Sequence, residues 1–428
     1  MEFIDHIDSE NKKELLNVKN EERLGMHSFH RYYGKLIPAI PRTFIRKFTQ
    51  KGDLIFDPFS GSGTTALEAL YLDRNFLGVE INPLSVMFSR VKTSALDVSQ
   101  LKKLTYVLIE NIKNDADPVD PTELPFVINR DHWFKDFVQN DLAKIKRNFK
   151  PSIEALSVSS DIAILLENFL LSVLSAIVKQ VSNADTMHVF PGVSKRMRRL
   201  EEEGKIKIDV FATFKRALDK RIKYFEELGI HSGTVNILLG DASSINLESY
   251  KNSVDLIVTN PPYISSVRYA ETLKLELYWM GIAKSSKDYF KLSDAMIGND
   301  HISKSDYMTM QLTGYNEVDQ FIKTLFEIDK KQAKVVFDYF TLMEKVIKQA
   351  AFVLKKSKKL VMKISDSKIR KIKIPTGYLL TVIAEKNGFK LIDVFNDKIN
   401  ENSRSLLTSR NTYSDIILED NIVFWERI

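Results

Sequence analysis

The chain contains no cysteine among its 428 residues. This absence excludes disulfides, thiolate–zinc sites and any mechanism based on a cysteine nucleophile, and it fits a reducing cytoplasm. Long apolar runs are also absent, because no stretch reaches the roughly 18 uninterrupted apolar residues that a membrane span needs. The N-terminal segment is polar and mixed in charge, so we expect neither a signal peptide nor an anchor. These absences predict a cytoplasmic protein without a structural metal.

A strong excess of one charge is missing as well. The net charge is +6 and the pI is about 9.0, with 28% charged and 44% hydrophobic residues. These values are ordinary for a soluble globular protein, so the positive excess matters only where it is clustered. The length allows two or three domains, or one domain with a large insertion.

The first clear pattern is a β-strand, glycine turn, helix and second strand. Residues 53–57 form a short apolar strand, residues 58–65 read PFSGSGTT, and residues 75–82 form the second strand. This order predicts a parallel sheet with helices on its faces. The next strand of this type, 235–242, comes only after the stretch 97–234, and a compact parallel fold does not need about 135 residues there. We therefore predict an N-terminal arm (1–26), a catalytic domain (27–96 and 235–428) and an inserted helical domain (97–234).

The second half continues the same alternation. Another long excursion spans 264–335, and then a helix (335–355), a strand (358–366), a helix ended by Gly388 (374–389) and a strand (390–400) follow. Residues 413–428 are interpreted as a terminal hairpin that turns at Glu419-Asp420-Asn421. The predicted fold is α/β: a doubly wound, mainly parallel Rossmann-like sheet with an antiparallel C-terminal hairpin and an inserted helical domain.

The glycine turn indicates a nucleoside cofactor. Gly61 and Gly63 fit a G-x-G-x-x-A pattern, and Glu80 ends the next strand 19 residues after Gly61, where it can bind ribose hydroxyls. Asp57 closes the strand before the glycines; an acid there suits the cationic part of S-adenosylmethionine and does not suit a pyrophosphate. No lysine follows the second glycine, which excludes a P-loop. The alternative is a tight turn with incidental glycines.

Two further strand ends carry polar residues. Asp241 lies at the end of the strand 235–242 and can accept a hydrogen bond from an adenine amino group. The alternative is a solvated strand end or a helix cap. A buried strand ends at Asn260-Pro261-Pro262-Tyr263, which is either a stiff turn or a site that holds a planar amino group.

Together these segments resemble the S-adenosylmethionine-dependent DNA amino-methyltransferases, which make N6-methyladenine or N4-methylcytosine. The segments DPFSGSGTT, GVEINP, LLGDA and TNPPY resemble that family's successive motifs. Upstream, the family has a segment H-x-Y-x-x-K-x-x-P that closes over the cofactor. It is resembled here by HSFHRYYGKLIP, with His30 at the first position. The resemblance covers roughly 27–96 and 235–428, with the recognition domain inserted between them. It implies cofactor contacts from Tyr32, Lys35, Pro38, Asp57, Phe59, Ser60, Gly61, Gly63, Thr64, Glu80, Ile81, Asp241 and Ala242.

The resemblance makes Asn260, Pro261, Pro262 and Tyr263 the catalytic motif. The lone pair of an exocyclic amino nitrogen is delocalised into the base, so the nitrogen is a poor nucleophile. The side-chain carbonyl of Asn260 and the backbone carbonyl of Pro261 can accept its two N–H bonds, while the prolines hold both acceptors still. Tyr263 offers a face for stacking. A paired base cannot present this nitrogen, so base flipping is implied.

The identity of the base is left open. Asparagine at the first motif position favours adenine, which we take as the primary expectation, whereas the flanking segments 261–281 and 374–389 also look like those of cytosine-N4 enzymes. Methylation of RNA or of a protein glutamine amide would use the same chemistry. Two further hypotheses stay open, a non-catalytic DNA-binding relic and a nicotinamide oxidoreductase.

The densest basic region lies in the insert and predicts contacts with the phosphates of double-stranded DNA. The same charges would also suit a solvated helix face. The predicted DNA contacts are Lys195, Arg196, Arg198 and Arg199, with Arg404 and Arg410 in the polar segment 400–411. Tyr269 is a candidate for the base pocket, whereas Tyr278 and Trp279 are expected in the core. A cognate restriction endonuclease is a possible partner, and the sequence leaves the oligomeric state open.

Overall fold

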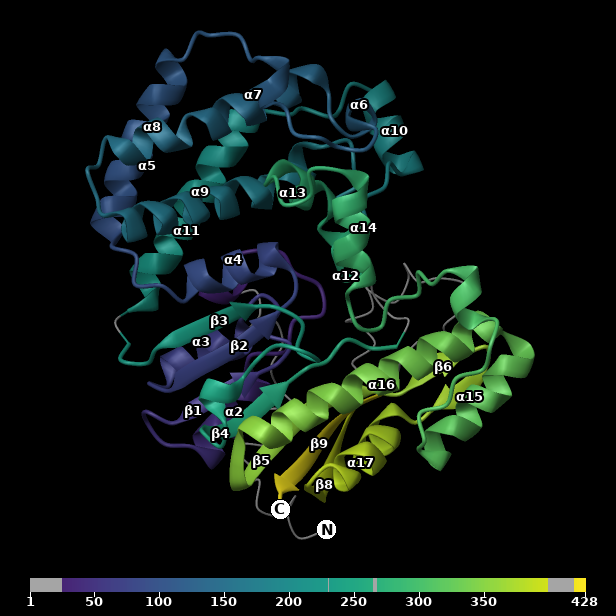
Figure 1. Ribbon diagram of the computed structural model, residues 1–428. Helices are drawn as coiled ribbons and strands as arrows, with labels where there is room; N and C mark the ends of the chain where they lie inside the picture. Colours follow the sequence, from purple (N-terminus) through teal and green to yellow (C-terminus); the bar gives the residue numbers. More distant parts are fainter. Residues whose placement is uncertain (1–24, 230, 265–267, 399–418) are drawn as a thin grey trace.

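The computed structural model describes residues 25–229, 231–264, 268–398 and 419–428 (Figure 1). The predicted N-terminal arm and the segment with Arg404 and Arg410 therefore lie outside the described residues, apart from residues 25 and 26. Seven strands form one sheet in the order β3-β2-β1-β4-β5-β9-β8. The strands are β1 (Leu54–Asp57), β2 (Asn75–Glu80), β3 (Val235–Leu239), β4 (Val254–Thr259), β5 (Leu354–Ser365), β8 (Phe389–Lys398) and β9 (Glu419–Arg427).

The direction of the strands confirms the predicted fold class. Strands β3, β2, β1, β4 and β5 run parallel to one another, whereas β9 runs antiparallel to both β5 and β8. The predicted turn at 419–421 is wrong, because these residues belong to β9. Asp420 pairs with Ser365 on one side and Asp397 on the other. Hydrogen bonding from two neighbouring strands outweighs the local turn preference of these polar residues.

Two apolar layers cover the sheet, as alternate strand residues point to opposite faces. In β5, Leu360, Met362 and Ile364 face one layer and Val361 faces the other. The first layer comprises α15 (Asn316–Ile328), α16 (Lys330–Val353) and α17 (Thr376–Lys386), and the second α2 (Ala39–Phe48), α3 (Thr64–Tyr71) and α4 (Pro83–Lys92).

The segment between α4 and β3 is helical and stands above the sheet in Figure 1. Its 22-residue helix α9 is long and apolar enough to cross a membrane, but half of its most apolar window is buried inside the protein. The helices are α5 (Val98–Asn114), α6 (Arg130–Trp133), α7 (Asp136–Arg147), α8 (Phe149–Glu154), α9 (Ser160–Val181), α10 (Lys195–Glu202) and α11 (Val210–Leu228).

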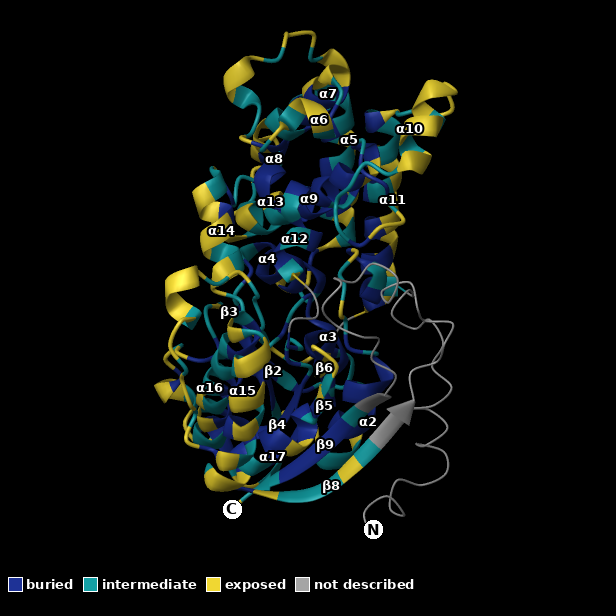
Figure 2. Ribbon diagram, turned by 90° about the vertical axis from the view of Figure 1, so that its right-hand side faces the viewer, coloured by how far each residue is buried: buried dark blue, intermediate teal, exposed yellow. Residues whose placement is uncertain are grey.

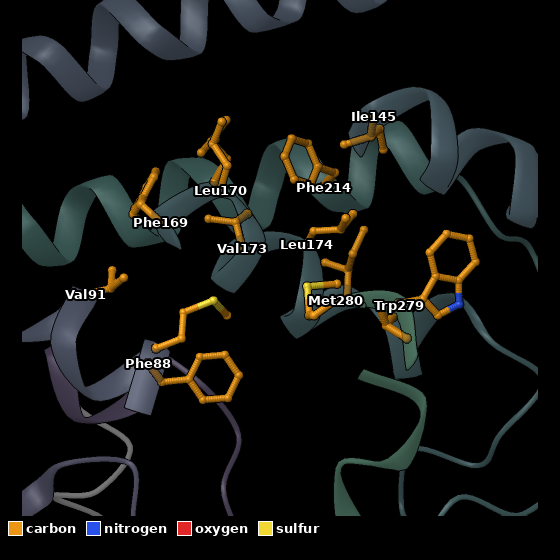
Figure 3. Packing of buried hydrophobic residues seen from close by; sticks show 14 of the residues in the cluster. Phe88, Val91, Ile145, Phe169, Leu170, Val173, Leu174, Phe214, Trp279 and Met280 are labelled. Atoms are coloured by element: carbon orange, nitrogen blue, oxygen red, sulfur yellow. The ribbon is translucent and has the colours of Figure 1, made fainter. Parts of the chain in front are cut away.

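This helical segment shares its core with the rest of the chain. Figure 3 shows Phe88 and Val91 of α4 below Leu174 of α9, with Trp279 beside them. Tyr278 and Trp279 are fully buried, which confirms their expected place in the core. They belong to the excursion after β4, which contains α12 (Tyr269–Thr272), α13 (Lys274–Trp279) and α14 (Ser286–Asp294).

Burial follows the same arrangement. In Figure 2 the central strands and the centre of the helical segment are mostly buried, whereas β8 is intermediate to exposed, and exposed residues gather on the outer helices and loop tips. The central strands are thus covered on both faces, which leaves their ends available for a site.

Candidate active site

The carboxyl ends of four parallel strands meet at one edge of the sheet. Asp57 ends β1, Glu80 ends β2, Asp241 follows β3 by two residues, and Asn260 directly follows β4. Open α/β sheets bind ligands at this edge, beside the point where the strand order reverses. Here that point lies between β1 and β4. All four residues line one open cavity.

Most of the predicted cofactor residues line this cavity. Its walls also include Tyr269, as expected for the base pocket, together with Thr65, Met296 and Ile297. The predicted residues found in the lining are Tyr32, Lys35, Asp57, Phe59, Ser60, Gly61, Thr64, Glu80, Ile81, Asp241 and Ala242, with Asn260 and Pro262 of the motif.

The two glycines of the turn have different roles. Gly61 lies against the cavity with φ +51°, and its N–H donates to Glu80 Oε2 at 2.8 Å. Gly63 has φ +74° and begins α3, but it does not line the cavity. A Cβ added there would lie 1.9 Å from Ser89 Oγ. Gly63 therefore allows close packing of α3 on α4, and its expected cofactor contact stays a prediction.

Asp57 is buried and braces the turn. Its Oδ1 accepts from Thr259 Oγ1 at 2.6 Å and from the Phe59 N–H at 3.0 Å, and its Oδ2 accepts from Thr65 Oγ1 at 2.8 Å. Burial raises the pKa of Asp57 to about 6, although these hydrogen bonds favour the charged form. The carboxyl group thus joins the glycine turn to the last residue of β4.

Glu80 is also buried, and burial raises its pKa to about 7. One oxygen accepts from Gly61 and the other from the Asn82 N–H, each at 2.8 Å. An ionised carboxylate has about four acceptor positions, so two backbone donors leave capacity for further donors such as ribose hydroxyls. The free acceptor positions of Glu80 at this edge therefore fit the ribose of a nucleoside cofactor.

Asn260 is held in one orientation by neighbours from two segments. Its Nδ2 donates to the carbonyl of Gly34 at 3.1 Å, and its Oδ1 accepts from the Tyr263 hydroxyl at 3.1 Å. Tyr263 and Pro261 do not line the cavity, since Pro261 is buried and Tyr263 turns its hydroxyl to Asn260.

The segment before α2 encloses the cavity from another side. Tyr32 and Lys35 line it, and the Lys35 ammonium donates to the carbonyls of His27 and His30 at 2.8 and 2.7 Å. The His30 ring is buried, stacked on Phe88. Pro38 is the N-cap of α2 and does not line the cavity, because the chain has already entered the helix there.

Three residues near the centre were missed from the sequence. Thr65 and Thr259 brace Asp57, and Gly34 orients Asn260. A usable signal existed for the threonines, because each stands beside a recognised motif residue. Gly34 has φ +75°, and a Cβ there would lie 3.1 Å from the Tyr269 ring, a contact between distant segments that no local pattern shows.

The basic residues of the insert lie on α10, away from the cavity lining. Arg196 forms an ion pair with Asp185 at 2.6 Å, and Arg199 lies 3.9 Å from Glu203. Lys195 and Arg198 are exposed. Arg196 and Arg199 are exposed as well, so all four lie at the surface and two of them also have an acidic partner within the protein.

Comparison with known proteins agrees with this geometry. The family model described as DNA methylase matches residues 5–87. Type II methyltransferase M.MvaI of Kocuria varians is 26% identical over 410 residues, which cover 90% of this chain and 86% of that protein. Type II methyltransferase M.BsoBI of Geobacillus stearothermophilus is 22% identical, and the alignment covers 99% of this chain and 90% of that protein. The structure of an S-adenosylmethionine-dependent methyltransferase from Methanosarcina mazei aligns with a TM-score of 0.32 and 8% identity. The alignment covers 90% of this chain and 97% of that chain.

The sheet order and the cavity at its switch point fit an S-adenosylmethionine-dependent methyltransferase. In sequence the chain is similar to DNA methyltransferases, through the family model over residues 5–87 and through the two relatives over most of its length.

Proposed function

We propose that this protein methylates an exocyclic amino group of a flipped-out base at a specific site in double-stranded DNA. The observation that carries the proposal is the position of Asn260, directly after β4 and in the wall of the cavity that Asp57 and Glu80 also line. The bridge from Thr259 to Asp57 fixes this position relative to the glycine turn.

S-adenosylmethionine, when bound, supplies an electrophilic methyl group on a sulfonium. Glu80 would hold the ribose hydroxyls and Asp241 the adenine amino group. Asp57 would offer negative charge to the cationic end, and Tyr32 and Lys35 would enclose this end from the segment before α2. Gly61 allows this approach because it carries no Cβ.

Asn260 would orient the target nitrogen. Its Oδ1 points toward Tyr263, whose hydroxyl already occupies it at 3.1 Å. One N–H of the target amino group would replace that hydroxyl, and the Pro261 carbonyl would accept the other, which draws the nitrogen lone pair out of conjugation. Gly34 would keep the Asn260 amide from rotating, because its carbonyl accepts from Nδ2. The released Tyr263 ring would then stack on the base.

The base and its setting form the finer part of the proposal. Asn260 favours adenine N6 on the family pattern, and the flanking segments favour cytosine N4; the same two acceptors fit either amino group. We place the inserted domain 97–234 on the DNA as the recognition domain. We place the enzyme in the cytoplasm of a bacterium or archaeon, in a restriction-modification or related defence system with a cognate endonuclease.

The test is transfer of a labelled methyl group from S-adenosylmethionine to duplex DNA, with RNA and protein as parallel acceptors. Asn260→Ala should lose transfer by at least about a hundredfold, the typical cost of one preorganised donor or acceptor, while binding of the cofactor persists. Asn111→Ala is the control, because Asn111 is also half-buried but bonds to Ser152 within the insert.

Mass spectrometry of nucleosides from the modified DNA then separates N6-methyladenine from N4-methylcytosine. Sequencing of the modified positions gives the recognition site. Near-normal transfer by Asn260→Ala would contradict the mechanism, and labelling of RNA or protein in place of DNA would contradict the substrate.

A further inference from the structure

A small β-hairpin outside the main sheet lies at the same edge as Asn260. It consists of β6 (Ser367–Ile369) and β7 (Ile372–Ile374) and directly follows β5. Thr259 of β4 pairs with Met362 of the parallel strand β5, which ends three residues later. At about 3.3 Å per residue, β5 ends roughly 10 Å beyond the level of Thr259, and the hairpin begins two residues later.

One face of the hairpin is apolar and the other is basic. Ile369 and Ile374 are buried in the layer that covers the sheet. Outward-facing positions carry four cations, and residues 367–374 contain no acid. The exposed cations are Lys368, Arg370, Lys371 and Lys373.

Two like charges face each other across the hairpin, and this lowers its stability. Lys368 pairs directly with Lys373 across the two strands. Like charges at directly opposite positions of an antiparallel pair are destabilising. A hairpin selected only for stability would place opposite charges there.

The turn is strained as well. Arg370 and Lys371 have φ +49° and +67°. Two-residue turns with positive φ at both positions strongly favour Asn-Gly, because most side chains crowd the backbone there. Strain of this kind is retained where the surroundings enforce it and clusters at functional sites.

The surroundings do enforce it. The Arg370 guanidinium donates to Asp329 Oδ2 from Nε at 2.8 Å and from Nη2 at 2.6 Å, and Asp329 also caps α16. Among the residues that the structure describes, Lys373 has only an ion pair with Asp366 at 3.2 Å, and its exposed ammonium makes this pair contribute little in water. No hydrogen bond or ion pair of Lys371 is seen within the described part of the chain.

We infer that the β6–β7 hairpin is a binding site for the phosphate backbone of double-stranded DNA. The inference rests on the proposed function, which brings duplex DNA to this edge. Exposed lysines grouped on one hairpin outside the cavity suit phosphates, which supply affinity and register without reading sequence.

The test measures binding of the full-length protein to a duplex of random sequence, about 30 bp long, over a series of salt concentrations. Lys371→Gly and Lys373→Ala should each make the slope of log K against log salt less steep by about 0.9 per lost phosphate contact. Lys371→Gly should also raise the melting temperature, because glycine adopts φ +67° without strain.

Lys51→Ala is the matched control. Lys51 pairs with Asp73 at 2.6 Å with a side-chain exposure of 77%, close to the 72% of Lys373, but it lies before β1 at the opposite edge. Its salt slope should equal that of the wild type. If the wild type binds DNA and both hairpin variants match Lys51→Ala, the inference is wrong. If the wild type neither binds nor methylates DNA, the proposed function itself fails.

Discussion

At the scale of single residues, the site depends on buried carboxyl groups whose charge is costly. Asp57 and Glu80 are 3% and 9% exposed, and burial raises their pKa values to about 6 and about 7. Each is nevertheless held by hydrogen bonds that favour the ionised form. A cationic ligand would offset the cost of these charges, which gives the site a preference for S-adenosylmethionine over anionic nucleotides.

This arrangement predicts how cofactor affinity depends on pH. A cation favours the ionised carboxylates, so affinity should be highest above pH 7 and fall as the pH drops through the pKa values of about 7 and then about 6. Below its pKa, each carboxyl group that must be ionised for binding lowers the cofactor affinity by up to about tenfold per pH unit. Calorimetry between about pH 5.5 and 8.5 measures this. Asp57→Asn should weaken binding at pH 8 and flatten the lower part of the curve; a flat wild-type profile would refute the assignment.

At the scale of elements, the glycine turn positions two helices as well as a ligand. Gly63 begins α3 at a point where Ser89 of α4 leaves no room for a side chain. The same short motif thus serves the cavity through Gly61 and the packing of α3 on α4 through Gly63.

Gly63→Ala should therefore lower the free energy of unfolding by about 3 kcal/mol, combining strain at positive φ with overpacking. Ser89→Ala alone should be nearly neutral, because the Ser89 hydroxyl is buried and has no hydrogen-bond partner within the described residues. The double variant should recover the overpacking part. Urea unfolding measures all three, and the absence of any recovery would show that the contact with Ser89 is not the cause.

At the scale of the whole molecule, the helical insert and the cofactor half fold around one core. Side chains of α4, α9, α11 and α13 belong to the same buried cluster (Figure 3). The insert is therefore fixed relative to the cavity, which is what a recognition domain needs if it is to place one base at Asn260.

A shared core predicts a single unfolding transition. Leu174→Ala, in the buried centre of α9, should cost about 2–5 kcal/mol and lower together the temperatures at which helix is lost and cofactor is released. Ile164→Ala is the control, since Ile164 lies on the same helix and is 59% exposed. Circular dichroism and cofactor release should coincide on heating. Two separate transitions would instead show an insert that folds independently.

The sequence by itself determined the features that depend on local pattern. The period of apolar residues located the strands, and the order of motifs placed Asp57, Glu80, Asp241 and Asn260 at the ends of parallel strands, which must meet at one edge. Composition excluded a cysteine nucleophile.

Only the tertiary structure decided features that depend on contacts between distant segments. It extended β9 through Glu419-Asp420-Asn421, because two neighbouring strands satisfy its backbone. It assigned Gly63 to helix packing, Gly34 to the orientation of Asn260, and Thr259 to the bridge with Asp57, 202 residues apart. Such contacts leave no periodic trace in the sequence, because each depends on how separate elements pack.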